Sequence, residues 1–159
     1  MEQNKLAKWL KVIVAGIAVC GFFIYAFLIP DFGKTIVSDN PEFAYCYQPW
    51  LIFISLTALP CYAALFFAWK IFSNIEIDNS FSLQNARYLK WISWLAAGDA
   101  AFFFLGNIVL LFLGMNHPGI ILYSLIVVFA GVAISVAAAT LSHLVLKAAK
   151  LQEENDLTV

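Results

Sequence analysis

Asp99 is the residue with the clearest chemical potential, because it is an ionisable carboxyl group inside a long apolar stretch. An ionisable side chain within a membrane span is costly, and such residues often mark an ion, proton or ligand site. If a helical span begins at Trp91, a rise of about 1.5 Å per residue places Asp99 about 12 Å inside it. Counting to a similar depth on other apolar stretches reaches Tyr62 and Thr140.

Three roles for Asp99 are compatible with these surroundings. No Lys or Arg is expected at its depth, so the carboxyl is expected to be protonated or hydrogen-bonded to Tyr62, Thr140 or Ser135. Asn107 follows two helical turns later on nearly the same face and could form a buried polar pair with Asp99 that holds the helices together. Alternatively, the candidate intramembrane polar site could carry protons or cations, or bind a small ligand. Its members are Asp99, Asn107, Tyr62 and Thr140.

The other reactive side chains form no known catalytic or metal-binding pattern. Cys20 and Cys61 could approach Asp99, but with His143 one turn away their spacing matches no zinc signature. The motifs His-Glu-x-x-His, Gly-x-Ser-x-Gly, Cys-x-x-Cys and Gly-x-x-x-x-Gly-Lys are absent from the sequence. His117 and His143 are expected at opposite ends of one helix, where they cannot meet. We therefore expect a non-enzymatic protein without catalytic residues, a cofactor or a bound metal.

The elements that must position these side chains are membrane helices. Of the 159 residues, 63% are hydrophobic and 12% are charged, whereas soluble domains have about 25% charged residues. A soluble chain of this size could not bury so much apolar surface. Four continuous apolar stretches each reach the roughly 20 residues that a helical span needs. The sequence therefore predicts an all-α fold, an integral membrane four-helix up-and-down bundle that forms one domain and crosses the cell membrane several times.

The predicted elements follow the limits of these apolar stretches. The helices are expected over about residues 9–30, 50–72, 88–113 and 119–152, with an outer loop at 31–49, an inner loop at 73–87 and a polar tail at 153–159. The first stretch is longer than a typical signal-peptide core and lacks an A-x-A-like cleavage site, so we expect it to remain as a helix. Small residues such as Gly131, Ser135 and Ala139 predict tight packing of the last two helices, or a homodimer through one small-residue face.

The basic residues predict the orientation. Lys34 is the only one of the nine Lys and Arg residues in the outer loop; the others flank the N-terminus, the inner loop and the C-terminus. Cytoplasmic loops are enriched in Lys and Arg, so both termini are predicted to be cytoplasmic. Because these basic residues adjoin the membrane, the lipid bilayer is the expected partner, and direct binding of nucleic acid is not expected.

The inner loop and the tail hold the other distinctive residues. Ser82 is suited to cap a helix start, and Phe81 precedes it as an apolar staple. Asn155 is suited to a left-handed helix stop. These segments could be simple connectors with headgroup anchors, or they could form a docking surface for a cytoplasmic protein. The candidate docking residues are Phe81, Ser82, Asn85, Arg87, Glu153, Glu154, Asn155 and Asp156.

The pattern Phe81-Ser82-x-x-Asn85-Ala86-Arg87-x-Leu89 and the ending Leu151 to Val159 resemble a family of small bacterial membrane proteins. The family is catalogued as a domain of unknown function, and its members have about this length and four predicted helices. They are often encoded beside a small Cro-like helix-turn-helix regulator. The resemblance thus implies a regulatory or signalling partner of a cytoplasmic transcription regulator, and it supplies no catalytic residues.

A transport function is the alternative. Four short helices enclose little space, so a transporter or channel that uses Asp99 would need to be an oligomer.

Overall fold

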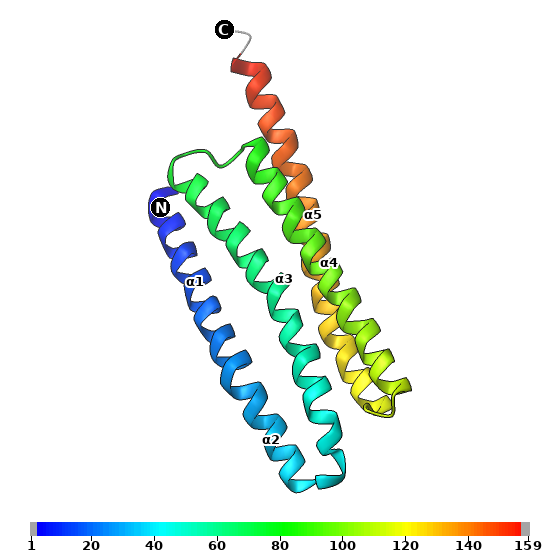
Figure 1. Cartoon of the computed structure of the whole chain (residues 1–159). Helices are drawn as coiled ribbons and strands as arrows, with labels where there is room; N and C mark the ends of the chain where they lie inside the picture. Colours follow the sequence, from blue (N-terminus) through cyan, green and yellow to red (C-terminus); the bar gives the residue numbers. More distant parts are fainter. Residues whose placement is uncertain (1–2, 157–159) are drawn as a thin grey trace.

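The chain is almost entirely helical. The computed structural model describes residues 3–156, and no strand occurs among them (Figure 1). Four of its helices, Gln3–Asp39, Pro41–Glu76, Leu83–Phe112 and Pro118–Asn155, are long and apolar enough to cross a membrane. Large apolar side chains cover the outside; Phe112, for example, is 85% exposed. Such a surface suits lipid rather than water, and the predicted all-α membrane fold is confirmed.

The first membrane helix is longer than predicted. It consists of α1 (Gln3–Phe23), the π-helical segment η1 (Ile24–Leu28) and α2 (Ile29–Asp39) without a break. Pro30 lies in the first turn of α2, where a proline is tolerated, and the π-helical turn precedes it. The predicted outer loop at 31–49 is therefore reduced to Asn40 and the short 3₁₀ turn η2 (Pro41–Phe43).

A tertiary contact accompanies this extension. The hydroxyl of Tyr47 donates a hydrogen bond of 3.4 Å to the carbonyl of Pro30. The ring of Tyr47 lies so close to Gly33 that a Cβ there would be 2.8 Å from it. Such a contact between α2 and α3 leaves no periodic signal in the sequence, which explains why the helical segment 31–39 was predicted as loop.

The later helices also extend beyond their apolar stretches. They are α3 (Ala44–Glu76), α4 (Leu83–Phe112) and α5 (Pro118–Asp156). The predicted cap of α4 is confirmed, because the Ser82 hydroxyl accepts a hydrogen bond of 3.2 Å from the backbone N–H of Asn85. The predicted left-handed stop at Asn155 is wrong, since Asn155 is helical. Residues 157–159 of the predicted tail lie outside the described residues.

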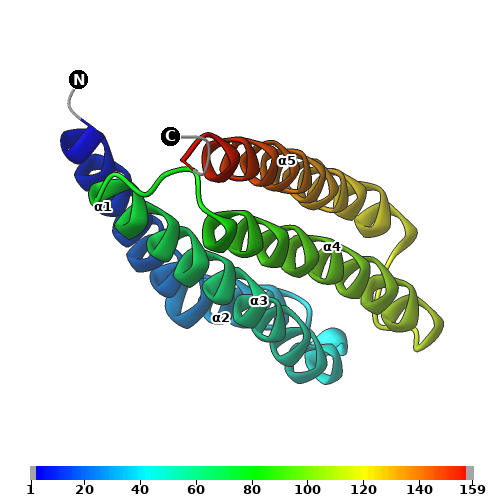
Figure 2. The same ribbon diagram turned by 90° about the horizontal axis from the view of Figure 1, so that it is seen from above.

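The helices form an open up-and-down bundle in which each packs on its neighbour in sequence. Seen from above, α1, α3, α4 and α5 follow one another in a curved row (Figure 2). Among the described residues, α1 and α5 share no substantial interface. The start of α1 and the end of α5 lie at the same end of the bundle, together with the connection 77–82 (Figure 1). We call this the termini end and the opposite end the hairpin end.

The α4–α5 interface has the small residues that the sequence predicted. A Cβ on Gly131 would lie 3.0 Å from the Cβ of Ala100, so the two backbones approach closely. Ser135 donates a hydrogen bond of 2.9 Å to the carbonyl of Ser93, and Ser142 donates one of 2.6 Å to the carbonyl of Ala86. The predicted tight packing of the last two helices is confirmed, whereas a homodimer stays a prediction.

Candidate functional site

Polar side chains gather in the middle of the bundle around Asp99. The thiol of Cys61 on α3 donates a long hydrogen bond of 3.5 Å to Oδ2 of Asp99 on α4. The other carboxyl oxygen, Oδ1, is buried and has no hydrogen-bond partner among the described residues. Buried polar atoms nearly always have a partner, so an orphaned carboxyl oxygen requires an explanation.

The same region receives a contribution from the first helix. The hydroxyl of Tyr25 lies 2.9 Å from that of Thr57. Thr57 donates its single proton to the carbonyl of Ile54, at 2.7 Å, so Tyr25 must be the donor in the first bond. Tyr25 also lies beside Cys61. We call Tyr25, Thr57, Cys61 and Asp99 the mid-membrane cluster.

The π-helical segment η1 positions Tyr25. A π-helical turn shifts the register of the side chains that follow, and such turns occur frequently at functional sites. Sequence reasoning missed both Tyr25 and Thr57. It assumed regular helices and could compare residues only by their depth in the membrane. The aromatic and hydroxyl residues in the apolar stretches were the signal that could have identified them.

The predicted partners of Asp99 bond elsewhere. Tyr62 donates a hydrogen bond of 2.7 Å to the carbonyl of Ala18, and Gly21 leaves room for its hydroxyl against α1. Thr140 is exposed and donates one of 2.9 Å to Val136 on its own helix. Ser135 bonds to Ser93. The expected hydrogen bonds from these residues to Asp99 are therefore wrong, because equal depth does not fix the direction in which a helix turns a side chain.

Asn107 belongs to a separate polar network at the hairpin end. Its side chain is 0% exposed and donates a hydrogen bond of 2.9 Å to Phe103. The amide of Asn116 donates to both the backbone and the side-chain oxygen of Asn107, at 3.0 and 3.1 Å. Asn107 thus fixes the turn between α4 and α5, and the predicted polar pair with Asp99 is not formed.

Asn85 organises the connection at the termini end. Its side-chain oxygen accepts a hydrogen bond of 2.7 Å from Asn74, and its amide donates to the carbonyls of Asn79 and Ser80 at 3.1 and 3.0 Å. It is 1% exposed, so its inclusion in a docking surface is wrong. The side chain of Asn85 instead stabilises the connection between α3 and α4. We call Asn74, Asn85 and the bonded backbone of 79–82 the loop network.

The other candidate docking residues differ in accessibility. Phe81 is 56% exposed, Arg87 is exposed, and Ser82 is half-buried and occupied with its cap. Glu153, Glu154 and Asn155 are exposed on the last turns of α5, which extends past the other helices (Figure 1). The side chain of Asp156 lies outside the described residues. Sequence reasoning missed two exposed apolar residues, Ile77 in the connection and Leu83 at the start of α4.

An ion pair joins the first two membrane helices at the same end. Lys11 of α1 binds the carboxylate of Glu76 at the end of α3, and its ammonium lies 5.6 Å from the ring centroid of Trp69. This pair connects residues 65 positions apart and was not predicted. It accounts for one basic and one acidic residue of the termini end.

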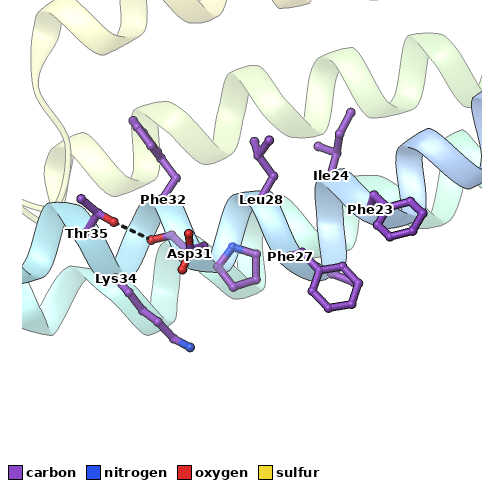
Figure 3. A pocket seen from close by; sticks show the side chains of 10 residues that line it. Phe23, Ile24, Phe27, Leu28, Asp31, Phe32, Lys34 and Thr35 are labelled. Atoms are coloured by element: carbon purple, nitrogen blue, oxygen red, sulfur yellow. Dashed lines mark hydrogen bonds between the residues drawn. The ribbon is translucent and has the colours of Figure 1, made fainter.

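A hollow lies on the outside of the first helix rather than at the mid-membrane cluster. It has a volume of about 750 Å³, and its lining comes only from α1, η1 and α2 (Figure 3). The side chains of Phe23 and Phe27 lie side by side there, with ring centroids 5.7 Å apart. Tyr25 is not part of this lining. Because this groove is formed by one helix, it is open to lipid. No group of three side chains that could together bind a metal ion occurs among the described residues.

Comparison with known proteins places the chain in a family. The chain is 33% identical to the uncharacterized membrane protein YoaS of Bacillus subtilis (strain 168) over an alignment of 153 residues. This alignment covers 95% of the chain and 96% of YoaS. No solved structure matches this chain. The family described as "Protein of unknown function (DUF2975)" matches residues 32–159, from α2 through α5. The chain is therefore a multi-pass membrane protein that belongs to this family of unknown function.

Proposed function

We propose that this protein is a non-enzymatic membrane regulator whose termini end binds a helix-turn-helix transcription regulator in the cytoplasm. The observation that carries the proposal is that the connection 77–82 and the last turns of α5, which both lie at that end, are mostly exposed. The Lys and Arg residues near this end support a cytoplasmic orientation.

The loop network supports the proposal because it holds the connection in one shape. Asn85 closes three side-chain hydrogen bonds within it, while Phe81 and Ile77 remain exposed beside it. Exposed apolar side chains on a rigid support are typical of interaction sites, because little conformational freedom is lost on binding.

The end of α5 adds negative charge to the surface. Glu153 and Glu154 follow one another on exposed helical turns. A helix-turn-helix protein carries a basic face for the phosphate backbone of DNA. Electrostatic complementarity favours its capture by an acidic helix, which would hold it away from its operator.

Site-specific photocrosslinking in cells tests this proposal. A photoreactive phenylalanine analogue at position 81 is expected to crosslink a helix-turn-helix protein that mass spectrometry identifies. The same analogue at Phe112, exposed at the hairpin end, is the matched control and is expected to yield no such product. The double variant Glu153→Gln/Glu154→Gln is expected to weaken the crosslink from position 81.

Transcript profiling of a deletion strain supplies the functional readout. Genes controlled by the captured regulator are expected to change expression, and the wild-type gene is expected to restore them. Equal crosslinking from positions 81 and 112, or unchanged transcripts after deletion, would contradict the proposal.

A second function, transport by an oligomer, is favoured by one observation: Oδ1 of Asp99 is buried and has no hydrogen-bond partner in the described part of the chain. A transporter of this kind would move protons or cations when reconstituted in vesicles, and Asp99→Asn would abolish the flux. Asp31→Asn, which removes an exposed acid on α2, is the matched control. Absence of flux for the wild-type protein, or equal flux for Asp99→Asn, would exclude this function.

A further inference from the structure

Four residues at the start of α4 form a mixed basic and aromatic stripe. Arg87, Lys90, Trp91 and Trp94 are spaced i, i+3, i+4 and i+7, which places them on one face of a helix. They line a hollow of about 460 Å³, and all four are exposed. The stripe therefore offers two cations and two indole rings to one ligand.

One of the two indole rings is held in place. The ring of Trp91 stacks on Phe67 of α3, with a centroid distance of 6.3 Å and an interplanar angle of 11°. Tyr88 packs on the same Phe67 ring, at 5.6 Å. Trp94, by contrast, is 66% exposed and projects from the helix. The stripe thus has one indole ring that is held against α3 and one that is exposed.

The two cations have no acidic partner among the described residues. Neither Arg87 nor Lys90 takes part in an ion pair or side-chain hydrogen bond there. Asp78, the acidic residue nearest to Arg87 in sequence, forms no ion pair among the described residues, and Glu76 is bound by Lys11. The first turn of α4 also lacks an acidic residue. A helix start carries partial positive charge, so two unpaired cations close to it create a strongly positive region.

We propose that Arg87, Lys90, Trp91 and Trp94 form a binding site for the phosphate headgroup of an anionic glycerophospholipid. The Arg guanidinium can bind two phosphate oxygens at once, and the Lys ammonium adds a second charge. Indole rings prefer the membrane interface, where they contact the glycerol region and the upper acyl chain. The membrane helix brings the site to the headgroup region, which favours a lipid over free phosphate. The site is independent of the regulatory function proposed above.

Native mass spectrometry of the purified protein, titrated with phosphatidylglycerol or phosphatidylcholine, tests this site. The wild-type protein is expected to bind phosphatidylglycerol in preference to phosphatidylcholine. In Arg87→Gln/Lys90→Gln the apparent affinity for phosphatidylglycerol is expected to fall about tenfold or more, because charge-assisted hydrogen bonds are lost. The matched control is Lys147→Gln/Lys150→Gln, which removes the same charge at the same end and is expected to retain binding.

A second pair of variants keeps the test valid if the double variant fails to fold. Trp94→Ala removes an exposed ring and is expected to weaken phosphatidylglycerol binding severalfold, whereas Trp9→Ala, on α1, leaves it unchanged. The proposal would be overturned if Arg87→Gln/Lys90→Gln and Lys147→Gln/Lys150→Gln lost the same affinity for phosphatidylglycerol. It would also be overturned if the wild-type protein bound both lipids equally. Complete displacement of phosphatidylglycerol by inorganic phosphate would overturn it as well, since it would identify a general anion site.

Discussion

The loop network and the mid-membrane cluster each contain a buried polar group, the Asn85 side chain and Oδ1 of Asp99, but they differ in how completely their hydrogen bonds are formed. The Asn85 side chain uses its oxygen and its amide in three bonds of 2.7 to 3.1 Å. Asp99 has one long bond to a thiol, and its second oxygen has no partner among the described residues. A saturated network favours a structural role, whereas an unsaturated carboxyl leaves capacity for a proton, ion or ligand.

The most sensitive test of this contrast is Asn85→Ala. The change removes three hydrogen bonds and leaves the amide of Asn74 and two loop carbonyls without their partner. We expect the free energy of unfolding to fall by roughly 3 kcal/mol. Denaturant titration in detergent micelles measures it. Asn79→Ala is the control, because Asn79 is exposed and contributes its backbone carbonyl to the network; little change is expected there.

Asn107→Ala examines the second saturated network with a smaller expected effect. The amide of Asn116 loses the side-chain oxygen of Asn107 but keeps its backbone oxygen at 3.0 Å. We expect a loss of about 2 kcal/mol, read from the same denaturant titration. The control is Asn40→Ala, whose amide donates to Ile36 in an exposed position and whose loss is expected to be small. A larger loss at Asn40 would show that the hairpin end depends on other contacts.

Tyr25→Phe probes the link between the first helix and the mid-membrane cluster. The variant loses the hydrogen bond to Thr57, but Thr57 remains bonded to Ile54, so no buried donor is orphaned. The expected loss in unfolding free energy is about 1 kcal/mol. Thermal unfolding followed by circular dichroism provides the measurement. Tyr123→Phe, at an exposed position on α5, serves as the comparison and is expected to match the wild-type protein.

The smallest effect is expected for Asp99→Asn. The amide oxygen can still accept from Cys61, and no other hydrogen bond of Asp99 has to be broken. We expect the free energy of unfolding to change by less than about 1 kcal/mol. Denaturant titration of Asp99→Asn and Asn85→Ala under the same conditions compares the two losses of unfolding free energy directly. A loss as large as that of Asn85→Ala would show that Asp99 is as structural as the loop network and would remove the basis for a transport function.

Sequence reasoning recovered the features that depend on local patterns. Four apolar stretches predicted four membrane helices, the Ser82 cap followed from turn chemistry, and the small residues of α4 and α5 predicted their close approach. Each of these signals lies within a few residues of the position it describes. The lengths of the helices were underestimated, because backbone helices continue past the apolar core of a membrane.

Features that depend on the rotation of one helix against another were not predictable in the same way. Tyr62 and Thr140 were expected to face Asp99, yet Tyr62 turns to α1 and Thr140 bonds within α5. The π-helical turn that contains Tyr25 changes the register in a way that periodicity does not reveal. The contact between Cys61 and Asp99 agrees with their expected levels along the helices, whereas the direction of each side chain around its helix could not be predicted.

The open row of helices has a consequence for how the chain folds. Each membrane helix packs on its neighbours in sequence, and the described part of α1 makes no substantial interface with α5. Contacts between neighbours in sequence close short loops and favour rapid folding. The bundle can therefore be assembled in the order of synthesis, with every newly inserted helix meeting a partner that is already in the membrane. The last step is then the pairing of α5 with α4 along their small-residue faces, a local event that requires no rearrangement of the first helix.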